Sequence, residues 1–236
     1  MGILRQRRRP APRSAPGSGR RRPRREPARH HGPQRHSSDR DRNHRAATKA
    51  HRAVRRLDDI LGGGDTYRVY SAEYQITKGI LRTGTYSEAV LRELLALLAE
   101  QAQQAGWAAF DGGREREAPG LYRESRSTAE EAGAGDLARN ALAFLAYQAG
   151  PTDPQAAATI AARSCAAITE QTPATVRALL WERYAWALAV VGDASGTDEA
   201  LHTAGTALDS ADADEPQPDW SAWVGRAELE IMAGRC

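Results

Sequence analysis

The sequence lacks most of the groups from which catalytic and metal sites are built. It has two cysteines, Cys165 and Cys236, without CxxC or Cys/His ligand spacing, so neither a disulfide framework nor a zinc site is expected. From residue 46 onward the only histidines are His51 and His202, which leaves few ways to form a Ser–His–Asp or Cys–His arrangement. The phosphate-loop motifs GxxxxGKS, GxxxxGKT and GxGxxG are missing as well. We expect no enzymatic activity, no cofactor and no metal.

Long apolar runs are also lacking. No stretch approaches the roughly 18–20 apolar residues of a membrane span. The N-terminal region has many arginines but not the apolar segment of a secretory signal. Together with the low cysteine content, these features predict a cytoplasmic protein that does not contact a membrane.

Charge is plentiful but unevenly distributed. Residues 1–50 hold 15 Arg, one Lys and three acidic residues, a net charge of +13, whereas the remainder holds 17 basic and 27 acidic residues, a net charge of −10. Residues 1–45 are rich in Pro and Gly, and Ile3 and Leu4 are their only large aliphatic residues, too few to offset the entropy of ordering. We predict a disordered basic tail over residues 1–45 and a folded domain over residues 46–236.

The arginines of this tail are candidates for a nucleic-acid-binding arm. Clustered arginines neutralise phosphates and give salt-dependent affinity that does not depend on base sequence. The arginines that would form the arm are Arg7, Arg8, Arg9, Arg20, Arg21, Arg22, Arg24 and Arg25. Two alternatives stay open: a solvated tail without a partner, and an artefact of a misplaced start or a frameshift, because high-GC DNA encodes Arg, Pro, Ala and Gly in almost any frame.

From residue 46 onward, helical patterns alternate with short Gly, Pro and Asp breaks, and there is no strand-like alternation. The expected helices span 46–61, 66–82, 86–111, 114–132, 135–149, 154–170, 174–191, 196–210 and 219–233. Cap residues at 85–88, Asp153 and Thr172 mark several helix starts. Glycines suited to a left-handed helix end are Gly84, Gly150, Gly192 and Gly234.

Four segments of this region repeat one pattern. They are QAGWAAFDGG (104–113), ALAFLAYQAG (141–150), RYAWALAVVG (183–192) and GRAELEIMAG (225–234), at spacings of 37, 42 and 42 residues. Each has a small residue third and Gly last, and the first three have an aromatic residue fourth. This spacing predicts a repeated helix pair, in which the small residue admits the second helix closely and neighbouring pairs stack.

The repeat resembles degenerate tetratricopeptide repeats. In the best unit, Gly106 matches the family's small position in the first helix, and Ala118 and Tyr122 match the small and aromatic positions of the second. Ser125 stands where the family has Ala, and the period is longer than the usual ~34 residues. The resemblance implies an all-α array of antiparallel helix pairs in a right-handed superhelix.

Longer segments resemble one group of proteins more closely. Residues 57–112, NALAFLAYQ (140–148), LLWERYAWA (179–187) and DWSAWVGRAELEIMAGRC (219–236) are similar to the repeat region of actinobacterial transcriptional regulators, which carry a phage-repressor-type helix-turn-helix before TPR-like repeats. Here an Arg-rich tail stands in the place of the helix-turn-helix, and the similarity stops at residue 236, where the family continues. We therefore expect a member that lacks its DNA-binding domain and is truncated at its C-terminus.

The resemblance implies a groove, lined by the first helix of each pair, for a protein partner or small effector. In this register the lining residues are Glu100, Gln103, Trp107, Phe110, Asp111, Phe144, Tyr147, Glu182 and Trp186. The alternative is that the aromatics are core between repeats and that the charged residues form a solvated face. Trp220 and Trp223 either pack on the preceding pair or form an exposed edge that promotes oligomerisation.

Three hypotheses for the function follow. The first is the partner- or effector-sensing region of a transcriptional regulator, which acts by protein contacts or effector binding. The second is a non-specific nucleic-acid-binding protein that uses the arginine arm, with the helical body as a scaffold. The third is a fragment that is inactive by itself.

Overall fold

Helices make up the part of the chain that the structure describes. The computed structural model describes residues 46–51, 63–211 and 216–236, and within these ranges it contains no strand, which confirms the expectation of an all-α protein. Residues 46–51 form a helical segment. The other elements are α2 Gly63–Thr83, α3 Glu88–Asp111, α4 Ala118–Ala132, α5 Gly135–Ala149, α6 Pro154–Cys165, α7 Ala174–Val191, α8 Ala194–Asp209, the 3-10 helix η1 Asp219–Ser221, and α9 Arg226–Arg235. The predicted tail and its arginines lie outside the described residues.

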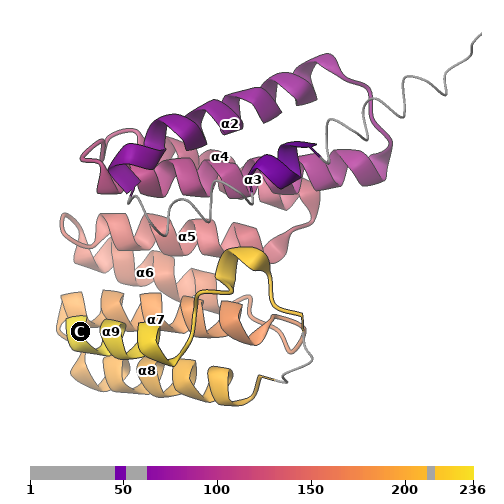
Figure 1. Ribbon diagram of the computed structural model, residues 1–236. Helices are drawn as coiled ribbons and strands as arrows, with labels where there is room; N and C mark the ends of the chain where they lie inside the picture. The colour runs from indigo at the N-terminus through magenta and orange to yellow at the C-terminus, as the bar shows by residue number, and fades with distance from the viewer. Residues whose placement is uncertain (1–45, 52–62, 212–215) are drawn as a thin grey trace, which may run out of the picture.

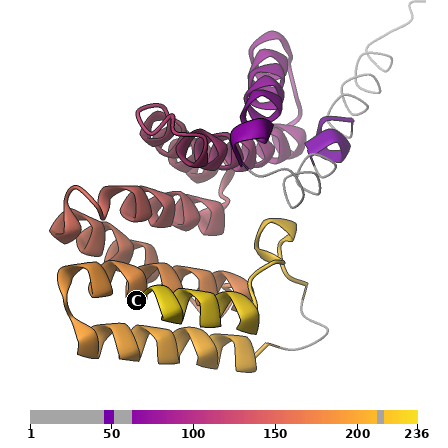
Figure 2. The ribbon, with the colours of Figure 1, turned by 60° about the vertical axis from the view of Figure 1, so that its left-hand side comes forward.

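The helices stack in chain order, each running opposite to the one before it (Figure 1). Every helix from α2 to α7 packs against its successor, and α5 also contacts both α3 and α7. These three helices therefore share one layer of the stack. Figure 2 shows α9 lying beside α7 and α8 at the far end. None of the described helices combines the length and apolarity needed to cross a membrane.

Local signals set several of the helix ends, although Thr172 does not cap α7, whose N-cap is Pro173. Ser87 and Asp153 accept hydrogen bonds from the backbone N–H groups at the starts of α3 and α6, as their cap positions predict. Gly192 ends α7 in the left-handed conformation, with φ 82°. Three expectations for glycine are wrong: Gly84 and Gly150 do not adopt the left-handed conformation, with φ −48° at Gly150, and Gly234 lies inside α9. None of these three positions needs glycine for its backbone angles.

Close helix approach requires a glycine in the best repeat unit. A Cβ atom added to Gly106 would lie 2.5 Å from the ring of Tyr122, on the neighbouring helix α4. Both residues are buried, as are Ala118 and Ser125. Small residues in α3 thus allow the aromatic ring of α4 to lie against the helix backbone, which is the packing that the repeat pattern predicts.

The C-terminal segment departs from the expected single helix over 219–233. It consists of the 3-10 helix η1, which follows Pro218, and the helix α9, which begins after Gly225. Trp220 is buried and belongs to the main core cluster, as does Leu179 of α7, whereas Trp223 is 49% exposed. The two tryptophans therefore have different environments, and oligomerisation through this edge stays a prediction.

Candidate functional site

Five aromatic side chains form a continuous stripe across one side of α3, α5 and α7. We name this stripe the aromatic face; its members are Trp107, Phe110, Phe144, Tyr147 and Trp186. The ring centroids of Trp107 lie 5.9 Å from Phe110 and 5.8 Å from both Phe144 and Tyr147. Tyr147 continues the stripe to Trp186, at 4.5 Å. These separations are typical of favourable aromatic pairs.

Each ring of the aromatic face is half-buried. Phe144 is stacked on the buried ring of Tyr122, at 5.0 Å and an interplanar angle of 4°. Trp186 lies against Gly150, where a Cβ atom would collide with its indole. The inner side of the aromatic face therefore packs against buried residues, while part of each ring stays exposed to solvent. This position combines features of the two alternatives for these aromatics, groove and core.

The charged side of the aromatic face is supplied by Arg183. Its guanidinium carbon lies 5.2 Å from the centroid of the Tyr147 ring, a cation–π geometry. The same group approaches Met232 of α9, with Nη1 3.3 Å from the sulfur, and lies 3.9 Å from the carboxylates of Glu182 and Glu228. Arg183 thus joins the aromatic face to α9.

Contrary to expectation, Glu182 does not line an open groove. Its side chain is fully buried, and among the described residues neither carboxylate oxygen has a hydrogen-bond partner. Burial raises the pKa of this carboxyl to about 7, against the opposing attraction of Arg183. The ion-pair distance of 3.9 Å is too long to compensate for desolvation, so Glu182 is a titratable group inside the protein.

Gln103 is also buried rather than open to a partner. Its amide nitrogen donates to the hydroxyl of Ser125 at 2.9 Å and to the carbonyl of Leu137 at 2.8 Å, and its oxygen accepts a hydrogen bond from Asn140 at 2.7 Å. These bonds join α3, α4 and α5. Because a buried amide needs such partners, Gln103 is a structural residue of the stack.

Glu100 lies on α3 beneath the helical segment 46–51. His51 of that segment is 2% exposed, and its Nε2 lies 3.2 Å from Glu100 while its Nδ1 lies 3.1 Å from Glu73. Desolvation acts to lower the pKa of His51, but hydrogen bonds and attraction to the two glutamates outweigh it and raise the pKa. Sequence spacing gave no sign of this cluster, because its members come from three separate helices.

Asp111, the last predicted groove residue, is exposed at the end of α3, next to Phe110. The structure therefore brings together the five aromatics and leaves Asp111 beside them. It places Gln103 and Glu182 in the interior and Glu100 against His51. Arg183, which contacts Tyr147, was not among the predicted groove residues, although its position three residues before Trp186 places both on one side of α7.

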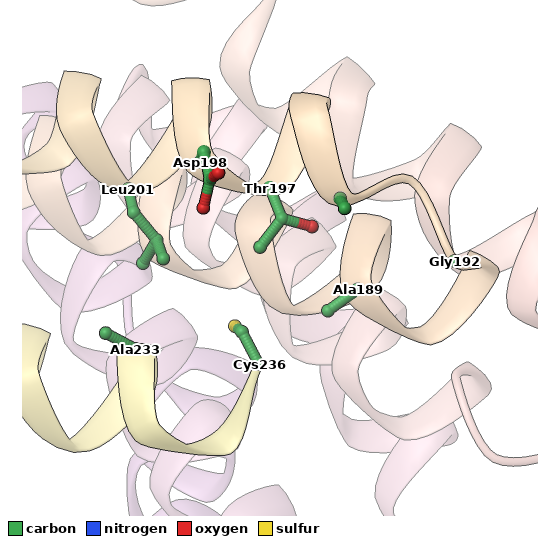
Figure 3. A pocket seen from close by; sticks show the side chains of 8 residues that line it. Ala189, Gly192, Thr197, Asp198, Leu201, Ala233 and Cys236 are labelled. Carbon is green, nitrogen blue, oxygen red and sulfur yellow. The ribbon is translucent and has the colours of Figure 1, made fainter.

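A depression of about 240 Å³, lined by no member of the aromatic face, lies between the end of α7, the start of α8 and α9 (Figure 3). Cys236 points into it, toward Thr197 and Asp198. Burial, with a smaller contribution from the charge of Glu182, raises the pKa of this thiol, which disfavours the reactive thiolate. In the described part of the chain, no cluster of three or more His, Cys, Asp or Glu side chains could hold a metal ion.

Comparison with known proteins gives little further information. No family model matches the chain, and no curated protein is similar to it. Among solved structures, the crystal structure of BtubC (BKLC) from P. vanneervenii is similar, with a TM-score of 0.43 and 12% sequence identity over 76% of this chain and 94% of that chain. A likeness of this size establishes neither a family nor a function.

Proposed function

We propose that this chain is a regulatory, partner-binding protein whose helix pairs form a TPR-like, right-handed superhelix. It acts by binding a protein or small effector, not by catalysis, and it is related to the repeat region of actinobacterial transcriptional regulators. The observation that carries the proposal is the aromatic face, which runs unbroken over three successive helices of one layer. In this proposal the protein is cytoplasmic.

Physical reasons favour binding at the aromatic face. Large aromatic side chains that are rigidly held and partly exposed supply most of the binding energy in protein interfaces. The rings here are fixed by contacts with one another, with Tyr122 and with Gly150, so little entropy is lost when a partner covers them. The interior of the stack, by contrast, is occupied by alanine and leucine side chains that a partner cannot reach.

The test compares the wild-type chain with two variants as bait for partners in an extract of the source cells. Trp107→Ser with Tyr147→Ser disrupts the aromatic face, whereas Trp223→Ser changes an exposed tryptophan outside it. We expect the wild type and the Trp223 variant to recover the same partner, and the double variant to recover it at least tenfold less. If all three chains recover the partner equally, the aromatic face is not the binding site and the proposal is wrong.

The second candidate function is non-specific nucleic-acid binding by the arginine arm. It is favoured by the 15 arginines within residues 1–45. The matching test measures DNA binding across a salt series for the full chain and for a chain in which the eight arm arginines are Gln. Binding that is steeply salt-dependent and lost in the Gln chain supports the arm. Salt-independent binding would exclude it.

A further inference from the structure

The aromatic face lies toward the C-terminal ends of three helices. Its rings sit in the C-terminal halves of α3, α5 and α7, and their mutual contacts show that these helix ends lie on the same side. None of the three helices has a basic residue in its last turn. The partial negative charge of each helix C-terminus therefore lacks the compensation that Lys or Arg usually provides there. A cationic ligand suits this end of the molecule.

One cation–π contact of the kind that such a ligand would make is already present in the aromatic face. Arg183 places its guanidinium over the Tyr147 ring at 5.2 Å, in the middle of the stripe. The other rings have partly open surfaces of the same chemistry. Arginine stacks on aromatic rings better than lysine does, because its guanidinium is planar and weakly hydrated. The preferred guest is therefore a segment that carries several arginines.

One such segment belongs to this chain. Residues 1–50 carry a net charge of +13 and the remainder a net charge of −10, so the two parts attract each other. The described chain begins at residue 46 in a helical segment that His51 fixes against Glu100 of α3. Glu100 precedes Trp107 on the same helix by two turns, a rise of about 10 Å. A chain of 45 residues leaving residue 46 is long enough to reach the aromatic face.

We propose that the aromatic face binds the arginine-rich arm, residues 1–45, of its own chain. This inference rests on the proposed function, because it names the partner of the same face. The docked arm has its arginines on aromatic rings and helix C-termini, where phosphates do not reach them. The body therefore competes with nucleic acid for the arm, and a partner that takes the face releases the arm.

The experiment uses full-length chains and a fluorescein-labelled peptide with the sequence of residues 5–29. The arm-neutral chain, in which the eight arm arginines are Gln, leaves the face open. We expect it to bind the peptide at least tenfold more tightly than the wild type, whose own arm competes at a high effective concentration. Adding Trp107→Leu and Tyr147→Leu to the arm-neutral chain should weaken binding about tenfold, whereas adding Trp223→Leu should leave it unchanged.

Two further measurements separate stacking from general attraction and from unfolding. A peptide with every Arg replaced by Lys keeps its charge and should bind about tenfold more weakly. Trp107→Phe keeps a ring in place and should retain most of the affinity, even where the Leu variant loses helicity by circular dichroism. Equal binding of both peptides, or equal binding by the wild-type and arm-neutral chains, would overturn the inference. The proposed function would then still stand if partner recovery depends on the aromatic face.

Discussion

Replacing Glu182 by Gln should stabilise the protein at neutral and alkaline pH and have little effect near pH 4. Burial raises the pKa of this carboxyl from 4.5 to about 7. The unfolded chain therefore releases the proton at a lower pH than the folded chain, and the stability that the protonated group provides is lost as the pH rises from 4.5 to about 7. At about 1.36 kcal/mol for each pKa unit, the loss above pH 7 is about 3 kcal/mol.

Urea unfolding of the wild-type and Glu182→Gln chains at several pH values measures this effect directly. All other titrating groups are shared, so the difference between the two free energies of unfolding isolates Glu182. We expect this difference to grow through the window between the two pKa values, with Gln the more stable above it. Glu230→Gln, an exposed change on α9, is the matched control. A difference that does not vary with pH, or a less stable Gln chain at alkaline pH, would refute the reasoning.

Three other changes test the packing. Gly106→Ala should destabilise the stack by about 1–3 kcal/mol in thermal or urea unfolding, because its Cβ meets Tyr122 at 2.5 Å, while Gly120→Ala, with nothing within 4 Å, should not. Gln103→Leu should lower the free energy of unfolding by about 1–3 kcal/mol for each buried hydrogen-bond partner that it leaves unpaired. An unchanged unfolding midpoint would contradict a stabilising role for the hydrogen bonds of Gln103. In the wild type, hydrogen-exchange protection of residues 46–51 should fall as the pH rises through the raised pKa of His51, and His51→Gln should abolish that pH dependence.

The sequence pattern was informative where an apolar helical run is followed directly by glycine, as at Gly150 and Gly192. The bounds of α5 and α7 agree with the predicted ranges 135–149 and 174–191. The predicted and observed helix bounds agree less well where tertiary contacts decide where a helix ends. α6 stops at Cys165 rather than at residue 170, and Trp220 leaves the predicted last helix to pack in the core against α7. A burial of this kind depends on a neighbour that local periodicity does not reveal.

Tertiary contacts also decide which of the predicted groove residues are buried and which are exposed. Helical spacing places Gln103 and Trp107 on nearly the same side of α3, yet one is bonded inside the stack and the other is half-exposed. The difference arises from α4 and α5, whose side chains surround Gln103. Likewise, Glu182 and Trp186 share one side of α7, but Glu182 is buried. Its neighbour Arg183 contacts Glu228 and Met232 of α9, so α9 covers this part of α7. One helix cannot show which residues of its stripe the next helix will cover.

The half-buried state of the aromatic face has a consequence for any mutational study of it. Phe144 stabilises the stack through its contact with Tyr122, and its neighbour Trp107 extends the same cluster toward solvent. A large-to-small change at either ring therefore lowers stability and removes binding surface at the same time. Trp107→Phe separates the two effects, because it keeps a ring against Phe144 while reducing the surface presented outward. If the face serves only packing, affinity and stability should change together in every variant; if it binds, loss of affinity should exceed loss of stability.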